Sequence, residues 1–137
     1  MNDYLVLTRR GEFVSECPSY QKDWCGSSKH SRFEYKIQII FHASFVGRDG
    51  IILYHEDIDE HIKKNLPKGT CEQMTESLIN SMKDLCKNNK IYPIVICTEV
   101  RPIFGNKKQL KAFLRRIYHV TDSRSLALLP LLSSSDF

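Results

Sequence analysis

Long apolar runs and paired-cysteine motifs are absent from this sequence, and their absence excludes several classes of protein. No window approaches the roughly 18 consecutive apolar residues of a membrane-spanning helix, so we expect no membrane span. The segment Met1–Arg10 is too short and too polar for a secretory signal peptide. The five cysteines form an odd set without a C-x-x-C pair. Free thiols in a reducing cytoplasm are therefore expected.

The sequence also lacks a large excess of positive or negative charge. The formal net charge is only +4 over 137 residues, which indicates solubility rather than a class of partner. One basic cluster stands out, and we interpret it as the solvated side of a helix. Nucleic-acid or membrane binding would require more charge and exposed aromatic residues, so neither partner is expected. The cluster comprises Lys107, Lys108, Lys111, Arg115 and Arg116.

The residues that are present suit one folded domain. The apolar fraction of 42% and the charged fraction of 26% are close to globular averages. A chain of this length can bury a core without disulfides or metals. Alternating apolar residues predict strands at 4–8, 35–41, 51–54 and 91–98, with a turn at Asp49-Gly50 joining the middle two as a hairpin.

Helical spacing follows between the third and fourth predicted strands. Ile58, Ile62 and Leu66 recur at every fourth position and predict one helix. The run Thr70–Gln73 fits a capping box and begins a second helix. Its buried stripe is expected to comprise Met74, Leu78, Met82 and Leu85. A further helix is predicted over Asn106–Val120. This order of elements is an α+β pattern.

Five short runs occur in the order and spacing of one known family. They are Phe13-Val14-Ser15-Glu16-Cys17, Cys25-Gly26-Ser27-Ser28-Lys29-His30-Ser31, Gly50-Ile51-Ile52-Leu53-Tyr54-His55, Gly69-Thr70-Cys71-Glu72-Gln73 and Cys97-Thr98-Glu99. Through these runs, the region from Phe13 to Glu99 resembles 6-pyruvoyltetrahydropterin synthase and 6-carboxytetrahydropterin synthase. The resemblance implies an α+β tunnelling-fold (T-fold) subunit, with an antiparallel four-stranded sheet and two helices on one face. It does not cover the chain beyond Asn106, where the helical spacing of the residues predicts a C-terminal helical tail. We therefore expect a tunnelling-fold domain at 1–105 and a helical extension of the same domain at 106–137.

The resemblance also implies a set of site residues. Cys25 stands at the position of the family's catalytic thiol, and Glu99 at that of the glutamate that binds the pterin ring. Thr70 and Glu72 stand at the helix start where the family places ligand contacts. Cys17 takes the position of a zinc-binding histidine.

Other positions depart from the family pattern. Lys29 and Ser31 replace the two histidines of the second zinc motif, and the connector at 64–68 lacks the family's Asp-His pair. Cys17, Cys25 and His30 could form a rebuilt zinc site, because thiolate and imidazole suit zinc. Their spacing matches no common zinc motif, and we favour the absence of metal over zinc.

Each candidate residue also has a structural alternative. Glu99 lies in an apolar strand and could accept two hydrogen bonds from the N–H edge of a ring, or could be a surface glutamate paired with Arg101. Cys25 is reactive only if a neighbour lowers its pKa, and is otherwise an inert thiol. Glu72 could bind a ligand or simply complement the helix dipole.

Two functions follow. The first is a 6-pyruvoyltetrahydropterin synthase-like protein that binds a pterin or purine-like ligand between the subunits of a homo-oligomer, anchored by Glu99, with reduced or lost lyase activity. If the protein is active, Cys25 would act as acid or base and zinc would polarise the side-chain oxygens of the substrate. The alternative is a non-catalytic ligand-binding or assembly protein on the same fold.

Overall fold

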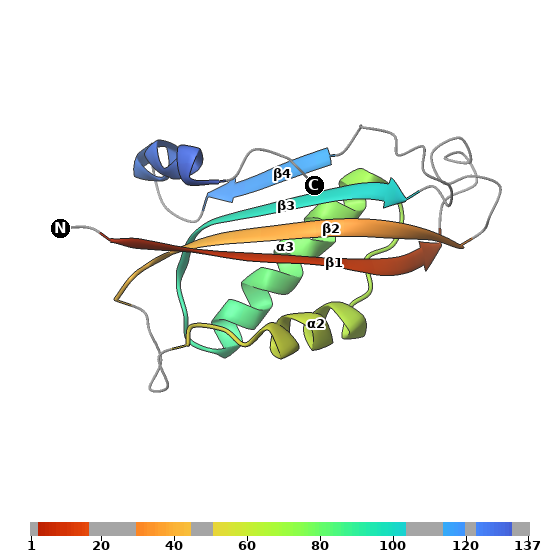
Figure 1. The fold of residues 1–137 in the computed structure, drawn as a ribbon, viewed down its shortest axis with the longest axis horizontal. Helices are drawn as coiled ribbons and strands as arrows, with labels where there is room; N and C mark the ends of the chain where they lie inside the picture. Colours follow the sequence, from red (N-terminus) through yellow and green to blue (C-terminus); the bar gives the residue numbers. More distant parts are fainter. Residues whose placement is uncertain (1–2, 17–29, 45–50, 104–113, 120–122, 133–137) are drawn as a thin grey trace.

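Four antiparallel strands and two helices form the fold, in the order strand, strand, helix, helix, strand, strand (Figure 1). The computed structural model describes residues 3–16, 30–44, 51–103, 114–119 and 123–132. The strands are β1 (Tyr4–Glu16), β2 (His30–His42), β3 (Pro93–Ile103) and β4 (Leu114–His119), and they are neighbours in the sheet in chain order. The predicted α+β class and four-stranded antiparallel sheet are confirmed.

Both helices predicted between the strands are present, although the first ends before Leu66. Helix α2 (His55–Lys64) has acidic residues in its first turn and lysines in its last turn, which complements the helix dipole. Helix α3 (Cys71–Asn88) begins at the predicted capping box. The Gln73 amide donates to Thr70 Oγ1 at 3.1 Å, and the Thr70 amide donates to Gln73 Oε1 at 2.9 Å.

Two predicted elements are wrong. Residues 51–54 form no strand; they lead into α2, and Tyr54 is its N-cap residue. The helix predicted over Asn106–Val120 is wrong at 114–119, which form β4 and pair with Val95–Val100 of β3. In β4, Leu114 and Tyr118 face the helices and Ile117 faces the opposite side. The apolar residues of this segment fit a period of two as well as a helical one, and pairing with β3 decides the outcome.

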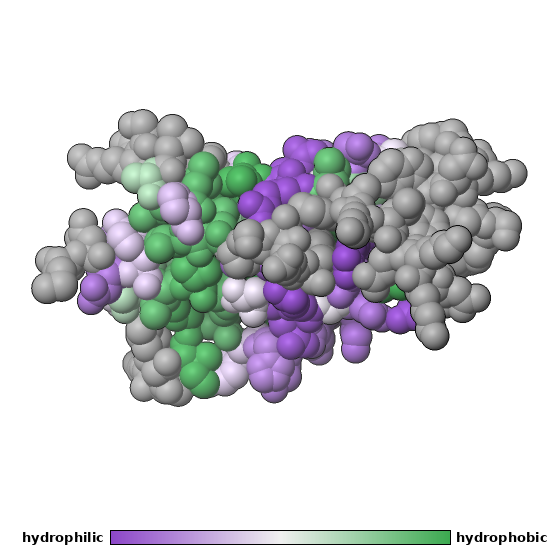
Figure 2. Space-filling model, turned by 45° about the horizontal axis from the view of Figure 1, so that its top comes forward, coloured by the Kyte–Doolittle hydropathy of each residue, from purple (hydrophilic) through white to green (hydrophobic). Residues whose placement is uncertain are grey.

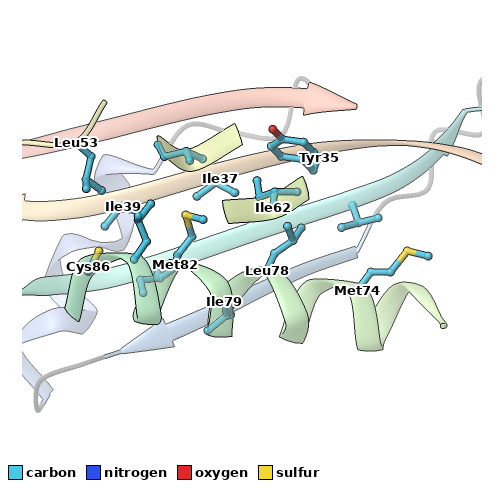
Figure 3. Packing of buried hydrophobic residues seen from close by; sticks show 14 of the residues in the cluster. Tyr35, Ile37, Ile39, Leu53, Ile62, Met74, Leu78, Ile79, Met82 and Cys86 are labelled. Carbon is cyan, nitrogen blue, oxygen red and sulfur yellow. The ribbon is translucent and has the colours of Figure 1, made fainter. Parts of the chain in front are cut away.

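The main core lies between the sheet and the helices (Figure 3). Ile37 and Ile39 of β2 pack there with Leu78 and Met82 of α3, and all four are fully buried. The whole predicted stripe of α3 is buried, as expected. Burial of this kind contributes about 25 cal/mol per Å² of apolar surface removed from water.

A second, smaller cluster covers part of the opposite side of the sheet. It comprises Ile40, Val95, Cys97 and Leu132, with Ile117 and residues of the 3-10 helix η2 (Ser123–Leu131) packed against it. Because side chains alternate along a strand, the neighbours of these residues on β2 and β3 that face away from the helices are Lys36, Gln38 and Glu99. Among the described helices, none is long and apolar enough to cross a membrane.

Candidate functional site

Glu99 of β3 is a fully buried carboxylate on the side of the sheet away from the helices. Its neighbour across the ladder is Arg115 of β4. The Arg115 Nε donates to Glu99 Oε1 at 2.7 Å, and its Nη2 forms an ion pair with the same oxygen. The alternative of a surface glutamate paired with Arg101 is wrong, since Arg101 instead binds Glu34, with its Nε 2.6 Å from Glu34 Oε2.

The second oxygen of this carboxylate, Glu99 Oε2, is buried without a hydrogen-bond partner. Two buried polar atoms of β2, Lys36 Nζ and Gln38 Oε1, also lack a partner. Only one other such atom, His61 Nε2, occurs in the described part of the chain. Lys36 is the register partner of Glu99 and is fully buried, while Gln38 lies two residues farther along β2 on the same side. Unpaired buried polar groups are costly, so their clustering marks this place as a candidate binding site.

The charges at the site lie within electrostatic reach of one another. Burial raises the pKa of the Cys97 thiol to about 11, with a further increase from the negative charge of Glu99, while Arg115 and Lys36 act in the opposite direction. On β1, Arg10 is the register partner of Lys36. A row of four charged residues therefore crosses all four strands; we call Arg10, Lys36, Glu99 and Arg115 the charged row.

An apolar zone adjoins the charged row on the same side of the sheet. Cys97 and Ile40 belong to the second hydrophobic cluster, and each lies two residues along its strand from Glu99 and Gln38, respectively. Figure 2 shows a hydrophobic band beside a hydrophilic region on one face of the molecule. A mainly apolar surface with a few polar groups at one end is typical of sites that bind organic ligands.

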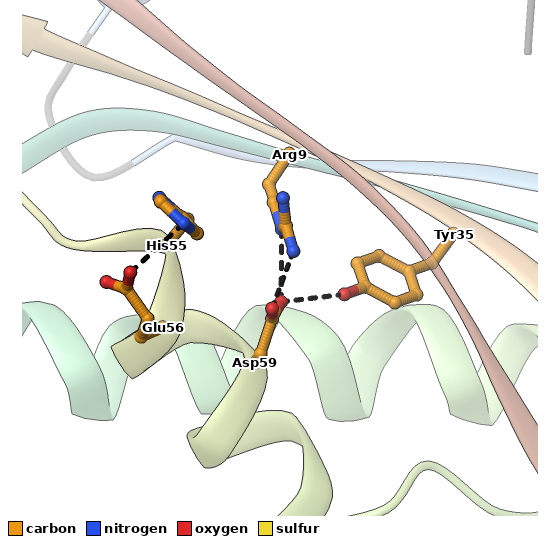
Figure 4. Close-up of polar contacts among 5 residues, drawn as sticks. All are labelled: Arg9, Tyr35, His55, Glu56 and Asp59. Atoms are coloured by element: carbon orange, nitrogen blue, oxygen red, sulfur yellow. Dashed lines mark hydrogen bonds and ion pairs between the residues drawn. The ribbon is translucent and has the colours of Figure 1, made fainter.

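A second polar cluster lies on the other side of the sheet, between β1, β2 and α2 (Figure 4). Arg9 Nε donates to Asp59 Oδ1 at 3.0 Å, and Tyr35 Oη lies 3.5 Å from the same oxygen. Burial is the main reason that the pKa of Tyr35 is raised. A cleft of about 190 Å³ opens beside these residues. Because the three polar groups bind each other, we interpret the cluster as structural.

The predicted ligand residues of α3 lie apart from Glu99 within one chain. Thr70 caps α3, and Glu72 is exposed in its first turn. Helix α3 packs against the other side of the sheet, where Thr98 Oγ1 donates to the carbonyl oxygen of Thr75 at 2.9 Å. The side chain of Glu99, the next residue, points away from the helix. One chain alone therefore does not bring Thr70 or Glu72 to the Glu99 carboxylate.

The residues predicted for catalysis and zinc are only partly described. Cys17 and Cys25 lie outside the described residues, so their predicted roles stay predictions. His30 is the first residue of β2 and pairs with Glu16 of β1 through the ladder. Within the described ranges, no group of three His, Cys, Asp or Glu side chains is arranged to hold a metal ion.

Lys36 and Arg115 are site residues that the sequence reasoning missed. Lys36 occupies a polar position in the alternating run Tyr35–Phe41, which normally indicates a solvent-facing side. The signal that could have found it is Ile40, which breaks the alternation and indicates burial on both faces of β2. Arg115 was assigned to the solvated side of a helix, and the strand β4 instead directs it towards Glu99.

With this topology the chain has the T-fold. Its fold is similar to the crystal structure of dihydroneopterin aldolase from Burkholderia thailendensis bound to guanine, with a TM-score of 0.58 and 6% identity over 86% of this chain and 91% of that one. Two other similar structures are an archaeosine synthase QueF-like protein in its apo form (TM-score 0.47, 17% identity, 84% and 90% covered) and 6-pyruvoyl tetrahydropterin synthase of Caenorhabditis elegans (TM-score 0.47, 9% identity, 87% and 97% covered). The sequence matches no protein-family model and no curated protein.

Proposed function

We propose that the protein binds a pterin or purine-like ring, with Glu99 as the anchor, as a divergent relative of the 6-pyruvoyltetrahydropterin synthases. The observation that carries this proposal is the state of the Glu99 carboxylate. One oxygen is held by Arg115, and the other is buried without a partner. A carboxylate fixed in this way can accept an N–H from a ligand at little further cost in side-chain entropy.

Two further observations support a ring as the ligand. The apolar residues beside Glu99, which include Cys97 and Ile40, would lie against the face of a planar molecule bound at this carboxylate. The similarly folded aldolase was crystallised with guanine, a purine whose edge carries N–H donors. A buried carboxylate that accepts from such an edge forms a charge-assisted hydrogen bond, which is about twice as strong as a neutral one.

The pocket is proposed to lie between subunits of a homo-oligomer. The outer edges of β1 and β4 pair with no other described strand, and open edges favour pairing with a further chain. A second copy could also bring its Thr70 and Glu72 towards Glu99, which one chain alone does not do. The proposed pocket would then need residues from both copies.

Lyase activity is proposed to be reduced or lost. Lys29 and Ser31 stand where the family has two zinc-binding histidines, and the Asp-His pair of the proton relay is missing from the connector. Binding by Glu99 requires neither zinc nor Cys25. A non-catalytic assembly protein on the same fold is the second candidate, favoured by the open strand edges.

Ring binding is tested by isothermal titration calorimetry with guanine and pterin. The wild-type protein is expected to bind at least one of them, and Glu99→Gln to bind about 10- to 100-fold more weakly because a hydrogen bond to a charged group is worth about 1.5–3 kcal/mol. Glu34→Gln is the matched control, since Glu34 also pairs with an arginine in the sheet. Wild-type-like affinity in Glu99→Gln would contradict the anchor. An oligomer that binds neither ring would favour the assembly protein.

A further inference from the structure

Two cations lie directly opposite each other at the β1 end of the charged row. Arg10 of β1 and Lys36 of β2 are register partners. Both side chains point away from the helices, because the adjacent residues of the strands, Arg9 and Ile37, point towards them. Opposite residues of an antiparallel ladder have Cβ atoms about 5 Å apart, and like charges at such positions destabilise the sheet. The pair therefore calls for a compensating negative charge.

The carboxylates on this side of the sheet do not supply that charge. Glu12, Glu34 and Glu99 lie there, and each binds an arginine of the described strands. Neither Arg10 nor Lys36 forms a hydrogen bond or an ion pair within the described part of the chain. Two positive charges, on directly opposite residues, are thus left over after the carboxylates have been paired.

Lys36 is the residue of this pair for which the missing charge is most costly. Its side chain is fully buried, and its ammonium group has three donors and no partner. Arg10 is exposed and lies on an edge strand of the sheet, so the pair extends from the solvent to the buried ammonium. Both side chains are donors only, and a partner must therefore bring acceptor atoms and negative charge.

The next register pair on the same side adds a further donor. Gln38 Nε2 donates to Thr8 Oγ1 at 3.4 Å, which leaves the hydroxyl proton of Thr8 free to donate. The other amide atom, Gln38 Oε1, is buried without a partner. A half-turn of this amide would let Oε1 accept from the Thr8 hydroxyl and would free Nε2 as a donor instead. Either arrangement offers one more donor beside the two cations.

We propose that Arg10 and Lys36 form a binding site for a phosphate group, either inorganic phosphate or the phosphate of a small monoester. A phosphate monoester carries about −1.5 to −2 charges at neutral pH and three strong acceptor oxygens, which matches two cations that have only donors. A carboxylate carries one charge and neutralises only half of the pair. The inference goes beyond the proposed function, because it requires neither a ring nor Glu99.

Glu99 weakens this site. It is the register partner of Lys36 on β3, and its negative charge repels a bound phosphate. Arg115, which holds Glu99 Oε1, offsets part of this repulsion. Glu99→Gln is therefore expected to bind phosphate about 3- to 10-fold more tightly than the wild-type protein does. The same variant is expected to bind a ring more weakly, so the two proposals predict opposite effects of one substitution.

Phosphorus NMR titrations with inorganic phosphate test the site, at neutral pH and at an ionic strength kept constant with chloride. The wild-type protein is expected to bind phosphate more tightly than acetate. Arg10→Met and Lys36→Met are each expected to bind phosphate about 10- to 100-fold more weakly, because each removes a charged donor to the anion. Arg10→Lys keeps the charge and should lose less than Arg10→Met does.

Lys63→Met is the matched control. Lys63 is an exposed lysine of α2, on the other side of the sheet, and its removal changes the net charge by the same amount. Screening by salt should keep its effect on phosphate affinity within about 2-fold. A wild-type protein that binds no phosphate overturns the inference, and so does wild-type affinity in folded Lys36→Met or a preference for acetate.

Thermal melts supply a second readout that does not depend on the titration. In chloride alone, Lys36→Met should melt at the wild-type temperature or above it, because it removes a buried charge and relieves the repulsion by Arg10. Phosphate should raise the melting temperature of the wild-type protein but not that of Lys36→Met. A clearly lower melting temperature of Lys36→Met in chloride would mean that Lys36 is paired within the chain, for example with Glu99, and would overturn the inference.

Methyl phosphate distinguishes the two sources of the phosphate group. Binding at least as tight as that of inorganic phosphate assigns the site to a monoester, and no binding assigns it to inorganic phosphate; both results support the site. If phosphate binds while guanine and pterin do not, the proposed function is wrong and this inference stands. If a ring binds while phosphate does not, this inference is wrong and the proposed function stands.

Discussion

Removing Arg115 should destabilise the protein more than its place on an edge strand suggests. In Arg115→Met, Glu99 loses the partner that holds its Oε1, while its other oxygen has none to begin with. The side chain of Glu99 is only 1% exposed and that of Arg115 is 28% exposed. In the variant, the Glu99 carboxylate therefore stays buried but loses the hydrogen bonds that Arg115 donates to it.

The expected loss can be bounded from this geometry. Removing one partner of a buried ion pair costs about 3–5 kcal/mol. The partial exposure of Arg115 lowers the estimate, so we expect the free energy of unfolding at pH 7 to fall by about 2–4 kcal/mol. Adding Glu99→Gln removes the stranded charge and should recover about 1–3 kcal/mol, which is the range of coupling between contacting residues.

Urea denaturation followed by circular dichroism measures both effects, at one protein concentration for all variants. The midpoint should shift in Arg115→Met without a change in the slope, because the same surface is exposed on unfolding. Arg32→Met is the control, since the Arg32–Glu12 pair has side chains that are 57% and 51% exposed and should contribute little. Equal losses in the two variants, or a double variant no more stable than Arg115→Met, would refute the reasoning.

Two other features give predictions away from the ligand site. Gly11→Ala places a Cβ 2.4 Å from Tyr35 Oη, so we expect a loss of about 1–3 kcal/mol in urea denaturation, partly relieved by Tyr35→Leu; an unchanged midpoint would contradict this. Burial raises the pKa of Cys86 from 9.0 to about 12. The folded state then holds this proton more tightly, so its contribution is fully present below pH 9 and is lost as the pH rises towards 12, at up to about 1.4 kcal/mol per pH unit. Cys86→Ala should show a flatter decline in stability over that range, and an equally steep one would count against the assignment.

The sequence predicts the two helices well because their signals come from residues that are close together in the chain. The capping box at Thr70 and the stripe from Met74 to Leu85 depend on residues within one helix, and both are confirmed. The strand β4 depends instead on a partner distant in the chain. Its residues fit a helical period as well as they fit a strand, and only the free edge of β3 decides between the two.

The residues of the candidate site differ in the same way, because one is recognisable from its own strand and the other only from its packing against distant parts of the chain. Glu99 could be found because a carboxylate in an apolar strand is unusual, and the structure places it in a buried position. Lys36 could not be found in this way, because a lysine at a polar position of an alternating strand is ordinary. Ile40 indicates burial on both faces of β2, but it does not identify which polar residue of the second side lies beside Glu99, because that depends on the pairing of β2 with β3.

The two sides of the sheet differ in how completely their polar groups are satisfied, and this difference supports the placement of the site. On the helix side, the polar side chains of Arg9, Asp59 and Thr98 are all hydrogen-bonded. On the other side, Lys36 and Glu99 face each other across the ladder with a donor and an acceptor unused. Replacing such a pair by apolar residues is often neutral or stabilising, so stability alone does not explain why it is there. The proposed role in binding would account for its unused hydrogen bonds.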